Sequence, residues 1–171
     1  MYDITFSHTV LKMAYSDHVP KETWEERYRW LRQMDEDFQH PFASYIVSPQ
    51  GTFISYDVET AFCAGAWVSV IVLTHAAIDA TIRDTEAGDY RSNSKVIFDN
   101  DPELEWLRKI RNSLVHVSED GKSKFLPEGG MHNIADYHEA LEKEAQRAIR
   151  LLFKVIYANP GLSRKVFSLH N

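Results

Sequence analysis

The stretch TAFCAGAWVSVIVLTHAAI, residues 60–78, decides the fold, because nineteen residues pass without an Asp, Glu, Lys or Arg. An apolar run of this length is long enough to span a bilayer as a helix. Ser69, Thr74 and His75 interrupt the run, Asp79 follows it directly, and no clear basic flank sets an orientation. We therefore interpret the stretch as the buried central helix of a helical bundle, and we expect no membrane partner.

The elements around this stretch are predicted from capping and turn residues. Asp57 can cap the central helix, which is then expected over about residues 58–87, with Gly88 as the glycine that ends it. Two β-prone runs in residues 42–57 flank the turn sequence SPQG at 48–51. These runs favour a short hairpin or an ordered loop before the central helix.

Three further segments are predicted to be helical. Apolar side chains recur at spacings of three and four residues over about residues 21–40. Asp101 and Pro102 form a cap followed by a proline at the first helical position, and a last helix is expected over about residues 133–158. Strands and helices do not alternate along the chain. The sequence therefore predicts a single all-α domain, residues 1–171, built as an antiparallel bundle of about four to five helices.

The composition is that of an ordinary globular protein of 171 residues, with 44% hydrophobic and 26% charged residues. The formal net charge of −6 excludes a nucleic-acid binder that works through its overall charge, so RNA binding would need a local basic patch. Cys63 is the only cysteine, so no disulfide forms within the chain, and a reducing, cytoplasmic setting is expected. The first residues also lack the basic and apolar regions of a secretory signal.

A second stretch, WLRKIRNSLVHV at residues 106–117, carries Arg111, Asn112 and His116 on a predicted amphipathic helix. At about 100° per residue, Asn112 and His116 lie on one face, whereas the directions of Arg111 and His116 differ by about 140°. One helix therefore does not bring the arginine and the histidine to one point. Two protomers that pack these helices across a two-fold axis would line one cleft with both copies. We therefore expect a homodimer through the helix that carries residues 101–118.

These side chains suit the cleavage of RNA. The ribose 2′-hydroxyl can attack the adjacent phosphate without a metal, and an imidazole with a pKa of about 6.5 can move the protons. A guanidinium can hold the phosphate and offset its charge, and an amide can orient either partner. The sequence therefore predicts an RNA-cleaving site that uses no metal and no cofactor. Cations expected to bind RNA beside it are Arg108, Lys109, Lys122 and Lys124.

The pattern Arg-Asn-x-x-x-His on a late helix of a small all-helical chain resembles the HEPN family (higher eukaryotes and prokaryotes nucleotide-binding). Active members of that family carry an Arg, four to six residues and then a His, often with a polar residue right after the Arg. The resemblance implies a metal-independent endoribonuclease of toxin or defence type that works as a dimer with a composite site. It also implies that Arg111 and His116 are the catalytic pair, with Asn112 as the supporting polar residue.

A cognate antitoxin protein is a partner that the resemblance allows. In one toxin subgroup, which is paired with a nucleotidyltransferase antitoxin, a tyrosine stands two residues after the His and is modified by the antitoxin. Ser118 occupies that position here, so the chain departs from that subgroup.

Two residues of the predicted central helix are candidate supporting groups for this site. His75 and Asp79 lie one turn apart on an otherwise apolar helix, and a buried carboxylate needs a partner. Asp79 can pair with Arg83 one turn further on, or it can reach across to hold Arg111, since related domains place an acid near the motif. The sequence leaves both pairings open.

Less reactive interpretations stand beside the catalytic one. The motif can lie on a solvated helix face, or on a catalytically inactive HEPN-like helical bundle that binds a partner protein, a nucleotide or RNA. His132 and His138 lack the spacing of metal ligands, so we expect no metal site. The apolar stripe that begins at Trp24 and Tyr28 is expected in the core rather than as a stacking platform for bases.

Overall fold

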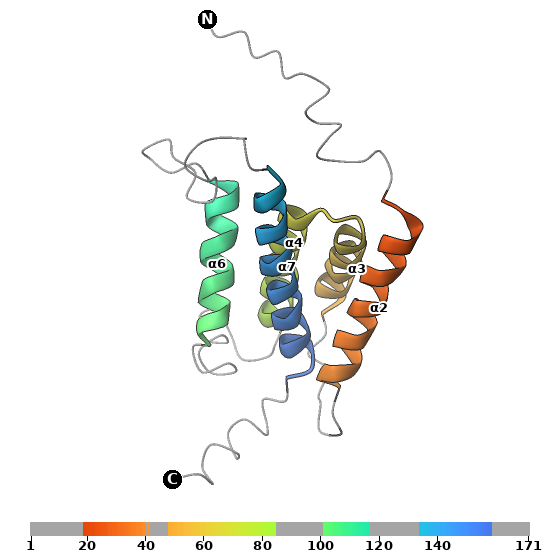
Figure 1. The fold of residues 1–171 in the computed structure, drawn as a ribbon. Helices are drawn as coiled ribbons and strands as arrows, with labels where there is room; N and C mark the ends of the chain where they lie inside the picture. Colours follow the sequence, from red (N-terminus) through yellow and green to blue (C-terminus); the bar gives the residue numbers. More distant parts are fainter. Residues whose placement is uncertain (1–18, 40, 42–47, 85–100, 117–133, 159–171) are drawn as a thin grey trace, which may run out of the picture.

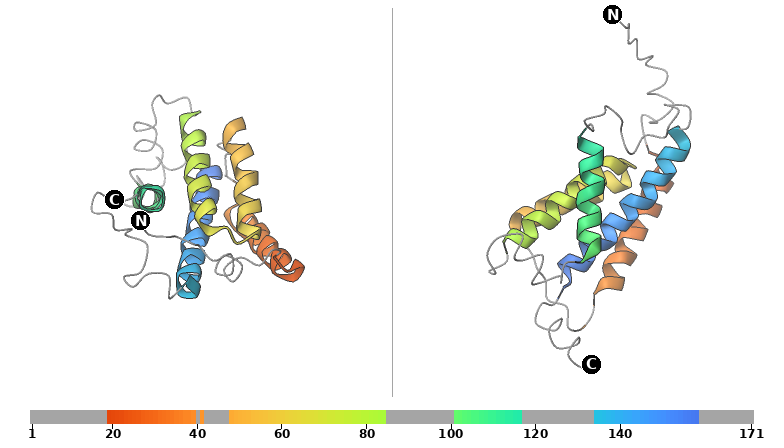
Figure 2. Two further views of the ribbon diagram at one scale, coloured as in Figure 1. Left: turned by 90° about the horizontal axis from the view of Figure 1, so that it is seen from above. Right: turned by 90° about the vertical axis from the view of Figure 1, so that its left-hand side faces the viewer.

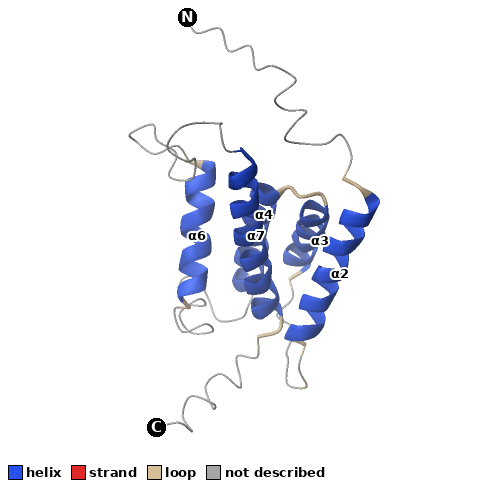
Figure 3. Cartoon of the chain, in the orientation of Figure 1, coloured by secondary structure: helices blue, strands red, loops and turns tan. Residues whose placement is uncertain are grey.

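The chain folds as an antiparallel bundle of helices, which confirms the predicted all-α class. The computed structural model describes residues 19–39, 41, 48–84, 101–116 and 134–158. Within these ranges the helices are α2 (Lys21–Phe38), α3 (Pro49–Cys63), α4 (Trp67–Arg83), α6 (Pro102–Val115) and α7 (Ile134–Ile156). The same ranges contain no strand (Figure 3). Helices α2, α4 and α7 run in one direction, and α3 and α6 run in the opposite direction (Figure 1).

Helices α4 and α7 form the centre of the bundle. Helix α4 packs against α3, α6 and α7, while α2 covers α3 and α7 from the other side. Viewed down the bundle, α6 stands at one edge and α2 at the opposite edge (Figure 2). The apolar stretch at residues 60–78 supplies much of the buried core, as expected. Its fully buried members include Phe62, Trp67, Val70, Ile71, Ala77 and Ile78.

The predicted continuous helix over residues 58–87 is wrong, because the chain turns a corner between α3 and α4. Gly65 has a φ of 74°. Glycine adopts this left-handed conformation with little strain, because it has no Cβ atom. The Ala66 N–H donates to the Ala61 carbonyl at 2.9 Å, and the Gly65 N–H donates to the Phe62 carbonyl at 3.0 Å. This pair of bonds is the Schellman helix end. Helix α4 ends at Arg83, and the expected stop at Gly88 lies outside the described residues.

The predicted hairpin or loop over residues 42–57 is also wrong from residue 49 onward, where the chain is already helical. Ser48 caps α3, because its hydroxyl oxygen accepts a hydrogen bond from the Gly51 N–H at 2.7 Å. Pro49 occupies the first helical position, where its missing N–H costs nothing. The sequence SPQG is therefore a helix start rather than a turn. Residues 42–47 lie outside the described part of the chain.

Aromatic side chains pack beneath the corner between α3 and α4. Phe62 stacks on Trp30 of α2, with 5.0 Å between ring centroids, and meets Trp67 of α4 edge-on at 5.3 Å. Arg27 of α2 lies over the Trp67 ring, and its Nη1 donates to the Cys63 carbonyl at 3.1 Å. The Cys63 thiol itself is buried, as expected of a core residue. The corner thus ties three helices together.

Candidate site on helix α6

Helix α6 begins as the sequence predicts. The Asp101 carboxylate accepts a hydrogen bond from the Glu103 N–H at 2.9 Å, and Pro102 follows at the first helical position. Leu104, Leu107 and Ile110 are buried against the bundle, and they define the inner face of α6. Arg111 and Asn112 therefore lie on the last turn and a half of a helix whose register is set by three aliphatic anchors, and His116 follows directly after this helix.

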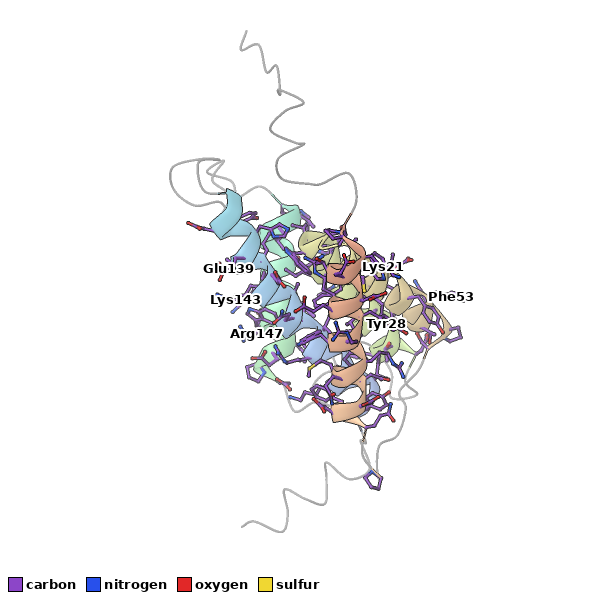
Figure 4. All side chains as sticks on the ribbon, turned by 45° about the vertical axis from the view of Figure 1, so that its right-hand side comes forward. Lys21, Tyr28, Phe53, Glu139, Lys143 and Arg147 are labelled. Carbon is purple, nitrogen blue, oxygen red and sulfur yellow. The ribbon has the colours of Figure 1, made fainter. Side chains whose placement is uncertain are left out.

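Two contacts fasten the first half of α6 to α7. Arg147 of α7 donates two hydrogen bonds to the Glu103 carboxylate, at 2.7 and 2.8 Å, and its guanidinium lies 3.9 Å from the centroid of the Trp106 ring. Lys154 of α7 forms an ion pair with Asp101. Figure 4 shows Arg147 on the outer face of α7 in line with Lys143 and Glu139. The candidate site lies at the other end of α6, away from these anchors.

Arg111 and Asn112 form a pair. Arg111 Nη1 donates to Asn112 Oδ1 at 2.9 Å, and both side chains are half-buried. The bond fixes the amide orientation, because the oxygen must face the guanidinium. Arg111 Nε is buried, and it has no hydrogen-bond partner among the described residues. The bond to Asn112 thus holds the guanidinium in place, while its Nε–H donates no hydrogen bond to a described residue.

His116 does not continue the helix. Its backbone is extended, with φ −120° and ψ 129°, although its N–H still donates to the Asn112 carbonyl at 3.0 Å. The imidazole is exposed at the end of α6. Within residues 101–116, no hydrogen bond joins Arg111 to His116, which agrees with their divergent directions on one helix.

The two candidate supporting residues, His75 and Asp79, lie on α4, which packs against α6. Asp79 forms an ion pair with Arg83, with 3.0 Å between Oδ2 and Nε, so the structure contains the local one of the two pairings that the sequence left open. Burial lowers the pKa of the His75 imidazole, and the positive charge of Arg111 lowers it further, while Asp79 raises it and Arg108 lowers it. The neutral form of the His75 imidazole is therefore favoured over the charged form.

The predicted basic patch is partly neutralised on its own helix. Arg108 donates two hydrogen bonds to the Glu105 carboxylate, at 2.7 and 2.9 Å, and Lys109 Nζ lies 3.6 Å from the same group. Glu105 was not predicted as a partner of these cations, although it precedes them by three and four residues, the usual spacing of such pairs on a helix. Lys122 and Lys124 lie outside the described residues.

The remaining histidines and acids do not build a metal site in the described part of the chain. No group of three or more His, Cys, Asp or Glu residues is placed to hold an ion there. His138 Nδ1 instead accepts a hydrogen bond from Trp67 Nε1 at 3.1 Å, so this nitrogen is unprotonated and satisfies the buried indole N–H. His132 lies outside the described residues. Among the described helices, none has the length and apolar character needed to cross a membrane.

The expectation of a fully buried stripe on α2 is wrong at its first two positions. Trp24 is 37% exposed and Tyr28 is 47% exposed, whereas Leu31 further along the same stripe is buried. Phe53 and Tyr56 of α3 are exposed as well, and Figure 4 shows Tyr28 and Phe53 on the surface of their helices. The helical spacing in the sequence groups Trp24, Tyr28 and Leu31 on one stripe of α2. It does not indicate which turns of this stripe another helix covers.

No protein-family model matches the chain, and neither a curated protein nor a solved structure matches it. The case for a function is therefore made from the residues of α4 and α6 and their chemistry.

Proposed function

We propose that the protein is a metal-independent endoribonuclease of the toxin or defence type, related in its site to the HEPN family. One observation carries this proposal. Arg111 is held by Asn112 on helix α6, while His116 is exposed at the end of the same helix. A phosphate-binding cation and a proton-transferring imidazole are the two groups that cleavage next to a ribose requires.

In the proposed reaction the ribose 2′-hydroxyl attacks the adjacent phosphorus. Arg111 holds the phosphate and offsets the charge that builds on its oxygens. His116 moves a proton as general base or general acid, and Asn112 keeps the guanidinium oriented. The products are a 2′,3′-cyclic phosphate and a 5′-hydroxyl. Because the nucleophile is part of the substrate, the reaction requires no metal ion.

A homodimer with a composite site is part of the proposal. Helix α6 lies at the edge of the bundle and packs mainly against α4 and α7, so the other described helices leave its outer face uncovered. That face carries Val115, which is 43% exposed, and the exposed imidazole of His116. Two copies related by a two-fold axis would bring the arginine of one protomer toward the histidine of the other. An antitoxin protein would then be expected to cover this cleft.

The proposal is tested by RNA cleavage in excess EDTA. We expect the wild type to cleave, and we expect both Arg111→Ala and His116→Ala to lose at least about 100-fold in rate, the usual effect of removing such groups. Lys143→Ala is the matched control, because it removes an exposed cation of α7 that pairs with Glu139. Each variant is first checked for helix content and for dimerisation. Cleavage that vanishes with EDTA and returns with Mg²⁺ would contradict the mechanism.

The alternative function is a catalytically inactive HEPN-like bundle that binds a partner protein, a nucleotide or RNA. The bonding of Arg108 to Glu105 favours the protein-binding form of this alternative, because a phosphate must displace the carboxylate before it can bind this cation. The two functions differ in one readout. A binding module would retain RNA or nucleotide affinity without product formation, and Arg111→Ala would weaken binding while His116→Ala would not.

A further inference from the structure

Helix α2 carries an open pocket, here called the α2 pocket, and α2 stands at the edge of the bundle opposite α6 (Figure 2). The pocket has a volume of about 420 Å³, and it is lined by Trp24, Glu25, Tyr28 and Arg29. At about 100° per residue these four side chains leave the helix within about 140° of one another, so they share one face. The pocket is separate from the candidate site on α6, and its residues have no role in the proposed cleavage.

The two aromatic rings of the α2 pocket are packed less closely than the other tryptophans of the chain. Trp30, Trp67 and Trp106 each lie against another ring or a guanidinium inside the bundle. Trp24 is 37% exposed and Tyr28, labelled in Figure 4, is 47% exposed, and among the described residues no other ring or cation stacks on either side chain. Single apolar residues are ordinary on a protein surface, but two exposed rings that line one pocket indicate a binding site.

Two charged groups of opposite sign line the same pocket. Glu25 offers a carboxylate, and Lys21 Nζ lies 3.5 Å from its Oε1. Both side chains of that ion pair are more than half exposed, so a ligand can displace the ammonium at little cost. Arg29 forms no ion pair with a described residue, so its guanidinium can bind an anion. The pocket thus combines two aromatic faces, a hydrogen-bond acceptor and a cation.

This combination fits a nucleotide better than an organic cation. Organic cations bind over aromatic rings, but Arg29 would repel one here. A flat base stacks on tryptophan and tyrosine through its π-face, and unpaired bases of RNA are commonly bound in this way. Among the bases of RNA, guanine carries two adjacent donors, N1–H and the N2 amino group, which match the two oxygens of one carboxylate. A phosphate on the same nucleotide matches a guanidinium.

We propose that the α2 pocket binds a guanosine nucleotide. The base stacks on Trp24 and Tyr28, the Glu25 carboxylate accepts hydrogen bonds from N1–H and the N2 amino group, and Arg29 donates to the phosphate. The ligand is either a free guanosine monophosphate or an unpaired guanosine within RNA, because both present the same base and the same kind of phosphate. The proposal does not depend on the ribonuclease function, so binding at α2 is measured independently of cleavage at α6.

The first test is the binding of guanosine 5′-monophosphate to the full chain, measured by isothermal titration calorimetry. Trp24→Ala should raise the Kd by about 5- to 150-fold, the usual effect of removing a ring that stacks on a base. Phe53→Ala is the matched control, because it removes an exposed ring of α3 that does not line the pocket, and it should leave the Kd unchanged. No saturable binding at millimolar nucleotide, or equal effects in the two variants, would overturn the proposal.

The second test concerns the base and the phosphate. Inosine 5′-monophosphate lacks the N2 amino group, so it should bind about 10-fold more weakly than guanosine 5′-monophosphate. Glu25→Gln should remove this preference, because an amide has a single acceptor oxygen, whereas Glu26→Gln, which changes an exposed acid outside the pocket, should keep it. Arg29→Gln should weaken binding of the monophosphate to the level of guanosine, which has no phosphate. A guanine preference that survives in Glu25→Gln would contradict the proposed recognition.

Further probes distinguish the sources of the ligand and the other occupants. Uridine oligonucleotides that carry one guanosine, made with 2′-O-methyl riboses so that they cannot be cleaved, bind more tightly than the free monophosphate if the ligand is RNA, and more weakly if it is a mononucleotide. Either affinity should fall in Trp24→Ala. Tetramethylammonium that binds in a Trp24-dependent way, without nucleotide binding, would make the pocket a cation site instead. Acrylamide should quench the fluorescence that Trp24→Phe removes, and an unquenched signal would mean that the chain itself covers this ring and fills the pocket.

Discussion

The α3–α4 corner and helix α6 are held in the bundle by different means. At the corner, Phe62 and Trp67 are fully buried, and their rings contact each other and a third helix. Helix α6 buries three aliphatic residues and is otherwise joined to α7 through charged groups on its first turns. Its last turn, which carries Arg111 and Asn112, has no ion pair to α7 among the described residues.

This difference suggests that the corner contributes mainly to stability and that the end of α6 contributes mainly to binding. Apolar burial provides most of the free energy that holds a bundle together, so the corner should dominate stability. A helix end with fewer apolar contacts opens at lower cost, and binding groups are commonly found in such places. The comparison predicts that substitutions at the corner mainly change the free energy of unfolding, while substitutions at the end of α6 mainly change activity.

The largest expected effect breaks the corner. Phe62→Ala leaves a cavity between Trp30 and Trp67, and we expect a loss of about 3–5 kcal/mol in the free energy of unfolding. Phe53→Ala is the matched control on the same helix, because that ring is 73% exposed, and it should change stability by less than about 0.5 kcal/mol. Urea unfolding followed by circular dichroism measures both. Equal losses in the two variants would contradict the assignment of the core.

A smaller effect is expected at the glycine of the corner. Gly65→Ala forces a side chain into a left-handed backbone conformation, which costs about 1–2 kcal/mol. The new Cβ would also lie 2.8 Å from Arg27 Nη1, a crowding that this flexible side chain can relieve by moving. Gly65→Asn experiences the same crowding but tolerates the backbone angle better, so it should lose less stability than the alanine variant. If the two variants unfold at the same urea concentration, the backbone argument fails.

The smallest effect concerns the link between α6 and α7. The hydrogen bonds from Arg147 lower the pKa of the Glu103 carboxyl group. Because the folded-state pKa is the lower one, the link stabilises the protein above the unfolded pKa of about 4.3, and its contribution disappears as the pH falls through the folded pKa. Glu103→Gln should therefore cost about 0.2–1 kcal/mol at pH 7, and nothing in strong acid.

The control for this last prediction is Glu105→Gln. Glu105 bonds to Arg108 on its own helix, so its removal does not loosen the contact between α6 and α7. Thermal unfolding at pH 7 should show a larger loss for the Glu103 variant than for the Glu105 variant. A loss for Glu103→Gln that persists unchanged in strong acid would mean that the effect does not come from the ion pair.

Much of the fold was predictable from local signals. The cap and proline at Asp101 and Pro102 located the start of α6 within one residue, and the periodic stripes located α2 and α7 within two residues at each end. The same kind of start at Ser48 and Pro49 was interpreted as a turn, because β-prone residues flank it on both sides. A capping residue followed by proline therefore predicts a helix start even where β-prone residues flank it.

The candidate site was predicted only in part. The spacing of Arg111, Asn112 and His116 indicated that one helix cannot join the arginine to the histidine, and their hydrogen bonds agree with this. The effect of the Arg111 charge on the pKa of His75 was not predictable from spacing, because the two residues lie 36 positions apart, on the helices α4 and α6 that pack together. The catalytic roles, the dimer and the RNA substrate stay predictions.

The amino-acid sequence by itself determined the helical class, the identity of the most buried segment and the register of α6. These properties depend on caps and on periodicity, which act over a few residues. Only the tertiary structure decided that the central segment breaks at Gly65, that Trp24 and Tyr28 face solvent, and that burial and the charge of Arg111 lower the pKa of His75. Each of these depends on which helices come together, and burial and charge are set by neighbours that are distant in the chain.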